Sequence, residues 1–168
     1  MTTHDKHWYA IYTNPRAEKK VAQALQQKGV ECYLPIQITI KQWSDRKKKV
    51  EEPLFKSYVF VHLNLELERL NVLNTVGVVK FVRIGGENPT IRPQIIEAIK
   101  LSIAHYSEIE MSTEPISINQ QVRVIAGPLQ GYVGVTIAQH GNQYFALQIE
   151  ELGAHMLLKI PIQYLQTI

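Results

Sequence analysis

Two patterns of apolar side chains divide the chain. Up to residue 105, short runs rich in aromatic and branched side chains alternate with segments whose apolar residues recur every three or four positions. This alternation predicts strands and helices in turn. Beyond residue 116 apolar residues recur at every second position, as in Val133, Val135 and Ile137, and turns with glycine separate the runs. The second pattern is typical of a small all-β domain.

Three helices are predicted among the strands of the first part. Asn14 followed by Pro15 is a helix-start signal and Gly29 a typical helix end, so we expect a helix between them. A short helix is expected around Leu70, and a longer one opens at Pro93. Strands are predicted at residues 8–13, 31–36, 58–63 and 78–84, with a hairpin at 38–50 tipped by the sequence SDRKKK.

The element order predicts an α+β fold, in which an N-terminal antiparallel sheet is flanked by helices. Residues 106–115 are polar and acidic without a clear period, which predicts a linker. The last part has short strands and tight turns, which predict a barrel of about five strands. We therefore expect an N-terminal domain at 1–105, a linker at 106–115 and a β domain at 116–168.

Charge is distributed unevenly along the 168 residues. Residues 1–60 hold 11 Lys and Arg against 6 Asp and Glu, a net charge of +5. Residues 61–168 hold 7 against 9, a net charge of −2, so the whole chain carries +3. Contact with a polyanion is therefore expected in the first third. A basic surface that only maintains solubility explains the same composition equally well.

Several classes of protein find no support in the sequence. The chain lacks the run of about 18 to 20 apolar residues that a membrane span needs. It also lacks the apolar core of a signal peptide, so we expect a cytoplasmic protein. The single cysteine, Cys32, excludes an intrachain disulfide. The six histidines show no metal-ligand spacing, and no nucleophile or acid pair stands out. We expect no enzyme activity and no cofactor.

Four sequence motifs resemble the NusG family of transcription elongation factors. VRVIAGPLQGYVGV, which contains Gly127, Pro128, Gly131 and Gly134, is similar to the KOW motif of its SH3-like C-terminal barrel. WYAIYT, EPLFKSYVFV and LNTVGVVKFVR resemble its N-terminal domain. KQWSDRKKKVEEPLF is most similar to the specialised paralogs, RfaH and the UpxY-type antiterminators of Bacteroidetes polysaccharide operons. The chain departs from the family in one place, since Lys56 replaces the proline of Phe-Pro-Gly or Phe-Pro-Asn.

The resemblance implies a factor that binds RNA polymerase across its cleft and suppresses pausing and termination, in an operon-specific role. In the family, an apolar surface docks on the clamp helices of the largest polymerase subunit. Carried over by motif, the contacts are Tyr12, Phe55, Tyr58 and Phe60. Ordinary core packing is the alternative, because strand alternation puts some of these side chains inside. The second pincer of the polymerase is approached by the segment containing Asn74 and Thr75.

The resemblance also implies contact with nucleic acid. Three helix cations, Arg16, Lys19 and Lys20, match positions that contact the non-template DNA strand in the paralogs. The hairpin cations could reach upstream duplex DNA or form only a soluble tip, and the sequence leaves both possibilities open. These hairpin cations are Arg46, Lys47, Lys48 and Lys49.

The predicted barrel is expected to bind a protein. From residue 116 onward its charges sum to zero, whereas a barrel that grips RNA is expected to be basic. We expect exposed Leu129, Tyr132 and Phe145 to meet the partner. In the family that partner is ribosomal protein S10, and Rho is disfavoured because the specialised paralogs do not engage it. A monomer without membrane contact is expected. The alternative is a KOW-containing RNA-binding protein that acts in translation or ribosome assembly.

Overall fold

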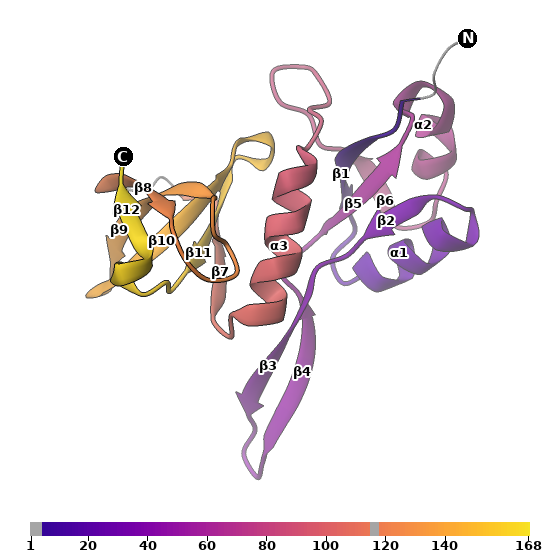
Figure 1. Ribbon diagram of the computed structural model, residues 1–168. Coiled ribbons are helices and arrows are strands. Elements are labelled where there is room, and N and C mark those ends of the chain that lie inside the picture. Colours follow the sequence, from indigo (N-terminus) through magenta and orange to yellow (C-terminus); the bar gives the residue numbers. More distant parts are fainter. Residues whose placement is uncertain (1–4, 115–117) are drawn as a thin grey trace. The chain divides into compact units, whose positions relative to one another are not determined.

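The computed structural model describes residues 5–114 and 118–168 and divides the chain into two compact units, one up to Pro93 and one from Gln94 onward (Figure 1). The division lies at the start of helix α3 (Pro93–His105), whereas the sequence placed the boundary after this helix. Among the described residues, no helix combines the length and apolarity needed to cross a membrane.

The first unit is built on a four-stranded antiparallel sheet in the order β2-β5-β1-β6. Its helices, α1 (Glu18–Gln27) and α2 (Leu65–Leu73), share one core cluster with the sheet. Tyr9 and Ile11 of β1 and Val59 and Val61 of β5 belong to this cluster. Successive side chains of a strand point to opposite faces, so Tyr12, Tyr58 and their alternate neighbours lie on the face away from the cluster. The strands are β1 (His7–Thr13), β2 (Glu31–Tyr33), β5 (Tyr58–Leu63) and β6 (Val78–Phe81).

The predicted start of α1 is wrong by three residues. The helix begins at Glu18 with Ala17 as its cap, rather than at Pro15 after Asn14. Arg16 has a φ of +64°, a left-handed conformation that cannot continue an α-helix, and the Asn14 amide donates to the Gly77 carbonyl at 2.9 Å. The end of the helix is as predicted, with Gly29 at a φ of +78°.

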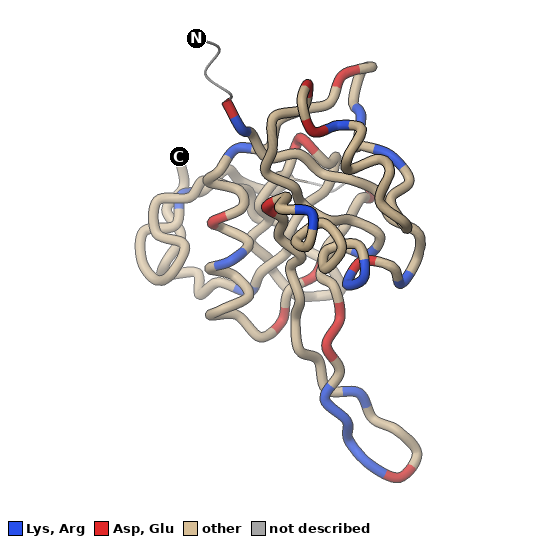
Figure 2. The backbone as a smooth tube through the Cα atoms, turned by 90° about the vertical axis from the view of Figure 1, so that its right-hand side faces the viewer, with Lys and Arg blue, Asp and Glu red and all other residues tan. Residues whose placement is uncertain are grey.

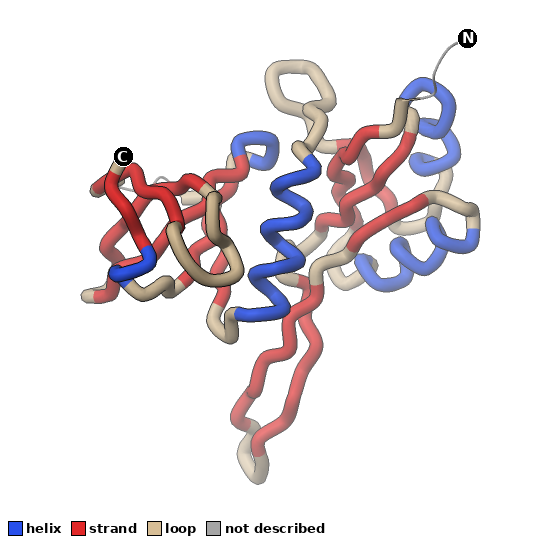
Figure 3. Tube along the Cα trace, viewed as in Figure 1, coloured by secondary structure: helices blue, strands red, loops and turns tan. Residues whose placement is uncertain are grey.

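A long two-stranded hairpin extends from the sheet of the first unit (Figure 3). Strands β3 (Ile36–Gln42) and β4 (Lys47–Pro53) pair along their whole length, from Ile36 opposite Pro53 to Gln42 opposite Lys47. Ile38 and Ile40 are among its exposed side chains. The hairpin predicted from the sequence is therefore confirmed, and its arms are longer than expected.

The second unit contains α3 and a six-stranded antiparallel sheet in the order β12-β8-β9-β10-β11-β7. Its core includes Val135, Ile137, Ala146 and Leu157. Strand β7 (Ile109–Ser112) lies within the predicted linker and pairs with β11. The sequence analysis missed it because it is only four residues long. The others are β8 (Gln120–Val124), β9 (Val133–Gln139), β10 (Asn142–Ile149), β11 (Ala154–Leu158) and β12 (Leu165–Thr167).

The predicted fold class is confirmed by these two units. The first unit is the expected antiparallel sheet with helices, and the second is the expected sheet-rich region with short strands and tight turns. Two short 3-10 helices, Glu150–Leu152 and Ile162–Tyr164, interrupt the strands of the second unit. The β-branched run in β9 is a strand, in agreement with its high β propensity.

Candidate functional site

Two tyrosines form a pair on the sheet face that lies away from the core cluster. Tyr12 and Tyr58 are directly opposite on β1 and β5, their ring centroids are 4.8 Å apart, and the Tyr58 hydroxyl donates to the Tyr12 hydroxyl at 3.3 Å. Lys80 from β6 places its Nζ 5.4 Å from the Tyr12 ring centroid. Burial, and then the hydrogen bond with Tyr12, raise the pKa of Tyr58 well above its ordinary value, so the Tyr58 hydroxyl keeps its proton at physiological pH.

The phenylalanines of the predicted docking set are buried and pack against each other, and Phe60 shares the sheet face of Tyr58, two residues before it in β5. Phe60 is 0 % exposed and Phe55 is 4 % exposed, and their rings meet edge to face with centroids 5.3 Å apart. Tyr33 of β2 stacks near Phe60 with a centroid distance of 6.4 Å. The structure therefore brings all four predicted aromatic residues together, but only Tyr12 and Tyr58 are partly accessible.

The turn that leads into β5 lacks the proline of the family motif and is held instead by hydrogen bonds of Ser57. Ser57 has a φ of +66°, a conformation that Gly and Asn adopt far more easily than Ser. Its carbonyl accepts from the Thr13 amide at 2.9 Å, and its amide donates to the Glu18 carboxylate at 2.8 Å. Glu18 is buried at the first turn of α1, where the helix dipole favours a negative charge. This carboxylate fastens the turn that positions Lys56 and Tyr58.

We expect Glu18→Ala to lower the free energy of unfolding by about 2 kcal/mol, because the partly buried amide of Ser57 loses a charged acceptor. Glu51→Ala is the matched control. Glu51 is exposed and lies 3.7 Å from Lys19, so its loss should change stability by less than about 1 kcal/mol. Urea titration of both variants measures the difference, and equal effects would contradict the role given to Glu18.

The segment predicted to reach the second pincer has one buried residue among exposed neighbours. Thr75 is buried; its hydroxyl donates to the Asn71 carbonyl at 3.1 Å and accepts from Lys28 Nζ at 2.9 Å. Asn74 is exposed, and Val76 is 92 % exposed. Thr75 therefore holds the loop in place, whereas Asn74 and Val76 present its surface. The sequence analysis did not single out Val76, because a lone valine before a glycine carries no signal.

The cations predicted to bind nucleic acid are all exposed and lie on α1, its N-terminal turn and the hairpin. Figure 2 shows basic residues concentrated at the far end of the hairpin. Lys47, Lys48 and Lys49 belong to β4 rather than to the turn. Lys41 and Lys56, which the sequence analysis did not select, line a hollow at the base of the hairpin.

The C-terminal unit corrects part of the predicted partner surface. Leu129 is 0 % exposed and Phe145 is 1 % exposed, so the prediction that they are exposed is wrong. Apolar residues of the KOW-like motif and of β10 instead form the core. Tyr132 is partly exposed, and its hydroxyl donates to the Gln94 carbonyl at 2.9 Å. Among the described residues of this unit, the large apolar side chains that are exposed are Ile118, Ile125, Val133, Ile162, Tyr164 and Ile168.

Gly131 and Gly134 of the KOW-like motif are required for different structural reasons. Gly131 has a φ of +95°, a backbone conformation that glycine adopts easily and residues with a Cβ adopt only with strain. Gly134 in β9 has no space for a side chain, because a Cβ would lie 2.5 Å from the Ala146 carbonyl oxygen and 2.6 Å from the Phe145 ring. The spacing of these glycines thus follows from the turn and the close approach of β9 to β10.

Comparison with known proteins agrees with this geometry. The family model described as "Transcription termination factor nusG" matches residues 6–100, which is more than half of the chain. The chain belongs to the NusG family. Members of this family are transcription termination and antitermination factors, so the sequence resemblance to NusG is confirmed. The match runs from β1 into α3 and therefore includes the tyrosine pair, the hairpin and the loop with Val76.

Individual NusG proteins extend the similarity beyond the family model. NusG of Staphylococcus carnosus is 28% identical over 140 residues, which cover 77% of each chain. NusG of Lactococcus lactis is 21% identical over 180 aligned positions, which cover 100% of this chain and 96% of that protein. A solved structure of Thermotoga maritima NusG covers 98% of both chains with a TM-score of 0.56 at 23% identity, which shows a shared fold.

Proposed function

We propose that this NusG-family protein is an elongation and antitermination factor that binds RNA polymerase across its cleft. The tyrosine pair carries the proposal. Tyr12 and Tyr58 are partly accessible and share one hydrogen bond, and Phe60 on the same sheet face is buried. Rigid aromatic side chains of this kind supply much of the binding energy at protein interfaces. In the proposal this face docks on the clamp helices of the largest polymerase subunit.

A second contact would lie on the loop after α2. Asn74 and Val76 are exposed there, and Thr75 with Lys28 fixes the loop from behind. A factor that touches both pincers binds the closed clamp more tightly than the open one, because opening breaks one of the two contacts. The population of closed complexes then rises in proportion to this difference in affinity. Suppression of pausing and termination follows from binding alone, without catalysis.

The non-template DNA strand is the proposed nucleic-acid partner of the first unit. Residues 1–93 hold 15 Lys and Arg against 9 Asp and Glu, a net charge of +6. Arg16, Lys19 and Lys20 are exposed, and the first two line the hollow at the hairpin base. Phosphate contacts from such side chains give salt-dependent binding with little sequence preference. The resemblance of the hairpin to specialised paralogs supports a role on particular operons.

A protein partner such as ribosomal protein S10 is proposed for the second unit. Residues 94–168 hold 3 Lys and Arg against 6 Asp and Glu, a net charge of −3, which disfavours RNA. Ile125, Ile162 and Tyr164 offer exposed apolar contacts instead. The same negative charge argues against the alternative function as an RNA-binding translation protein.

Single-round transcription with purified polymerase tests the proposed function. We expect the full chain to shorten pauses and increase readthrough at a terminator, and the double variant Tyr12→Ala/Tyr58→Ala to lose most of this effect. Tyr164→Ala, in the other unit, is the control and should act like the unaltered chain. Unchanged pausing and readthrough at saturating protein, on templates from several operons, would contradict the proposal.

A further inference from the structure

One face of the hairpin combines cations with an exposed aromatic ring. Cross-strand partners share a face, so Lys41 and Lys48, which are opposite in β3 and β4, lie on the same side. Trp43 follows β3 and joins this side, because Lys48 Nζ lies 4.6 Å from its ring centroid. Glu52 forms an ion pair with Lys41 and belongs to the same face. We call the side that carries these four residues the tryptophan face.

Trp43 has no packing role that explains its position. Its side chain is 46 % exposed at the far end of a two-stranded ribbon. A single exposed aromatic ring is common on protein surfaces, so the cations that accompany this ring carry the argument. Lys48 covers part of the indole, and much of its remaining surface is open to solvent. A flat, exposed ring flanked by cations is the arrangement on which unpaired bases stack.

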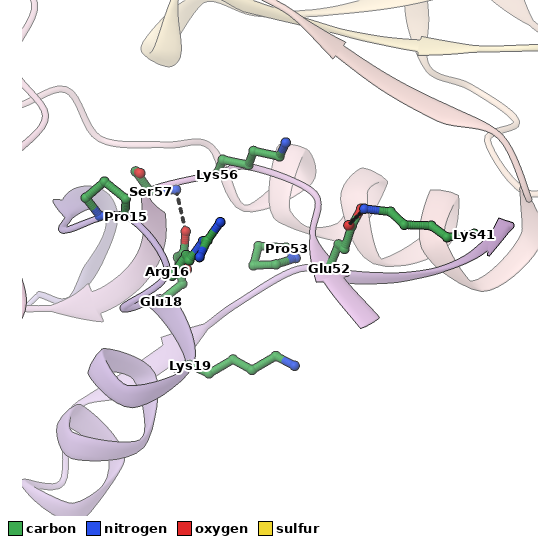
Figure 4. Close-up of a pocket in the computed structure, with 9 residues that line it drawn as sticks. All are labelled: Pro15, Arg16, Glu18, Lys19, Lys41, Glu52, Pro53, Lys56 and Ser57. Carbon is green, nitrogen blue, oxygen red and sulfur yellow. Dashed lines mark hydrogen bonds and ion pairs between the residues drawn. The ribbon is translucent and has the colours of Figure 1, made fainter. Parts of the chain in front are cut away.

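A basic hollow adjoins the tryptophan face at the base of the hairpin (Figure 4). It has a volume of about 530 Å³ and receives four cations from three segments, namely Arg16 and Lys19 near α1, Lys41 from β3 and Lys56 from the turn before β5. Its two carboxylates are both engaged. Glu18 accepts from the Ser57 amide, and Glu52 pairs with Lys41. The Lys41 ion pair, led by its hydrogen bond, lowers the pKa of Glu52, which is therefore ionised at neutral pH.

The hollow therefore favours an anion. Four positive and two negative side chains line it, a net charge of +2, and the nearby Glu51 carboxylate, 3.7 Å from Lys19 Nζ, lowers this to +1. Arg16, Lys19 and Lys56 surround the space around Pro53, with the Lys41–Glu52 pair at one side (Figure 4). A phosphodiester group would be attracted to these cations, and the shape is open enough for a polymer to pass through rather than end there.

We propose that a single strand of nucleic acid crosses this surface, with a phosphate in the basic hollow and a base stacked on Trp43. Lys41 lies between the two points, since its side chain reaches back to Glu52 in the hollow. Glu52 is opposite Gln37, six residues or roughly 20 Å of strand from Trp43, so the nucleic acid would span several nucleotides between phosphate and stacked base. A duplex keeps its bases stacked inside and could not offer one to the indole. An acidic peptide would use the cations but not the ring. The inference rests on the proposed function, because it defines where its DNA contact lies.

Fluorescence titration of the full chain with oligothymidylate tests the inference in the absence of polymerase. In a Trp8→Phe background the signal comes from Trp43 alone, and we expect the strand to quench it.

The anisotropy of a labelled strand measures the affinity of variants. Trp43→Ala should weaken binding roughly 10-fold, and Trp43→Phe should restore most of the affinity. Lys56→Gln should weaken binding and reduce the slope of log K against log salt by about 0.7. Lys6→Gln, an exposed cation outside the hollow, is the charge-matched control and should change both quantities less.

Other ligands separate the possible outcomes. A strand of abasic sites should bind with the same affinity to the unaltered protein and to Trp43→Ala. The inference would be overturned by equal quenching with polyglutamate, by tighter binding of a duplex that Trp43→Ala leaves unchanged, or by no binding of the single strand. The strand titration contains no polymerase, so it is independent of docking. If the unaltered protein binds the clamp helices but not the single strand, this inference alone is contradicted. Strand binding without any effect on transcription contradicts the proposed function alone.

Discussion

Gly134→Ala should unfold much of the C-terminal unit near physiological temperature. The new Cβ would lie 2.5 Å from the backbone oxygen of Ala146, and β10 cannot move away without breaking its register with β9. It would also lie 2.6 Å from the ring of Phe145, which is fully packed. Overpacking of this severity lowers the free energy of unfolding by about 3 kcal/mol. For a unit of this size the melting temperature would fall by roughly 15 °C.

Gly141→Ala is the matched control in the same unit. Gly141 has a φ of +76° and open space where a Cβ would be, so its replacement should lower stability by only about 1 kcal/mol. Calorimetry of the full chain, with amide exchange to assign the transition to β9 and β10, measures both variants. A smaller effect at Gly134 than at Gly141 would show that β9 and β10 are not packed as described.

Phe60→Ala is expected to lower the free energy of unfolding by about 3–5 kcal/mol. Phe60 is fully buried, and its ring contacts those of Phe55 and Tyr33. The cavity left behind cannot be filled by the β-sheet backbone on which these rings stand. Urea titration followed by circular dichroism measures the effect. Tyr58→Phe keeps the ring and removes one hydroxyl, so it should change stability by about 1 kcal/mol or less.

This prediction separates two explanations of the aromatic residues. A loss of polymerase binding in Phe60→Ala could arise from misfolding, whereas a loss in a stable Tyr58 or Tyr12 variant reports on the surface. If Phe60→Ala proved as stable as the unaltered chain, Phe60 would not be part of the packed core. Phe60 would then have to be counted among the surface residues of the proposed docking face.

Much of the fold could be predicted because local patterns and tertiary packing agree. Runs of aromatic and branched side chains in WYAIYT and YVFVHL predicted β1 and β5, and Gly29 marked the end of α1. Local signals failed where tertiary contacts overrode them. Asn14-Pro15 is a strong helix start, yet a hydrogen bond from Asn14 to Gly77, far away in the sequence, holds this segment in a turn. β7 is too short to show a period and exists because β11 pairs with it.

The sequence did not show which residues of the candidate sites are accessible to solvent. The aromatic set was found together, but alternation alone could not show that Phe55 lies against Phe60 or that Leu129 and Phe145 are buried. The basic hollow could not be predicted at all. Its cations come from segments as distant as Arg16 and Lys56, which only the folded hairpin base brings together.

Titration of the full chain with the isolated clamp helices of the largest polymerase subunit tests the central claim most directly. We predict one-to-one binding, weakened roughly 30-fold by Tyr58→Ala and similarly by Tyr12→Ala, as for residues at the centre of an interface. Both variants should remain folded by circular dichroism. Absence of binding, or binding that neither tyrosine variant weakens, would contradict the claim that this face docks on the polymerase.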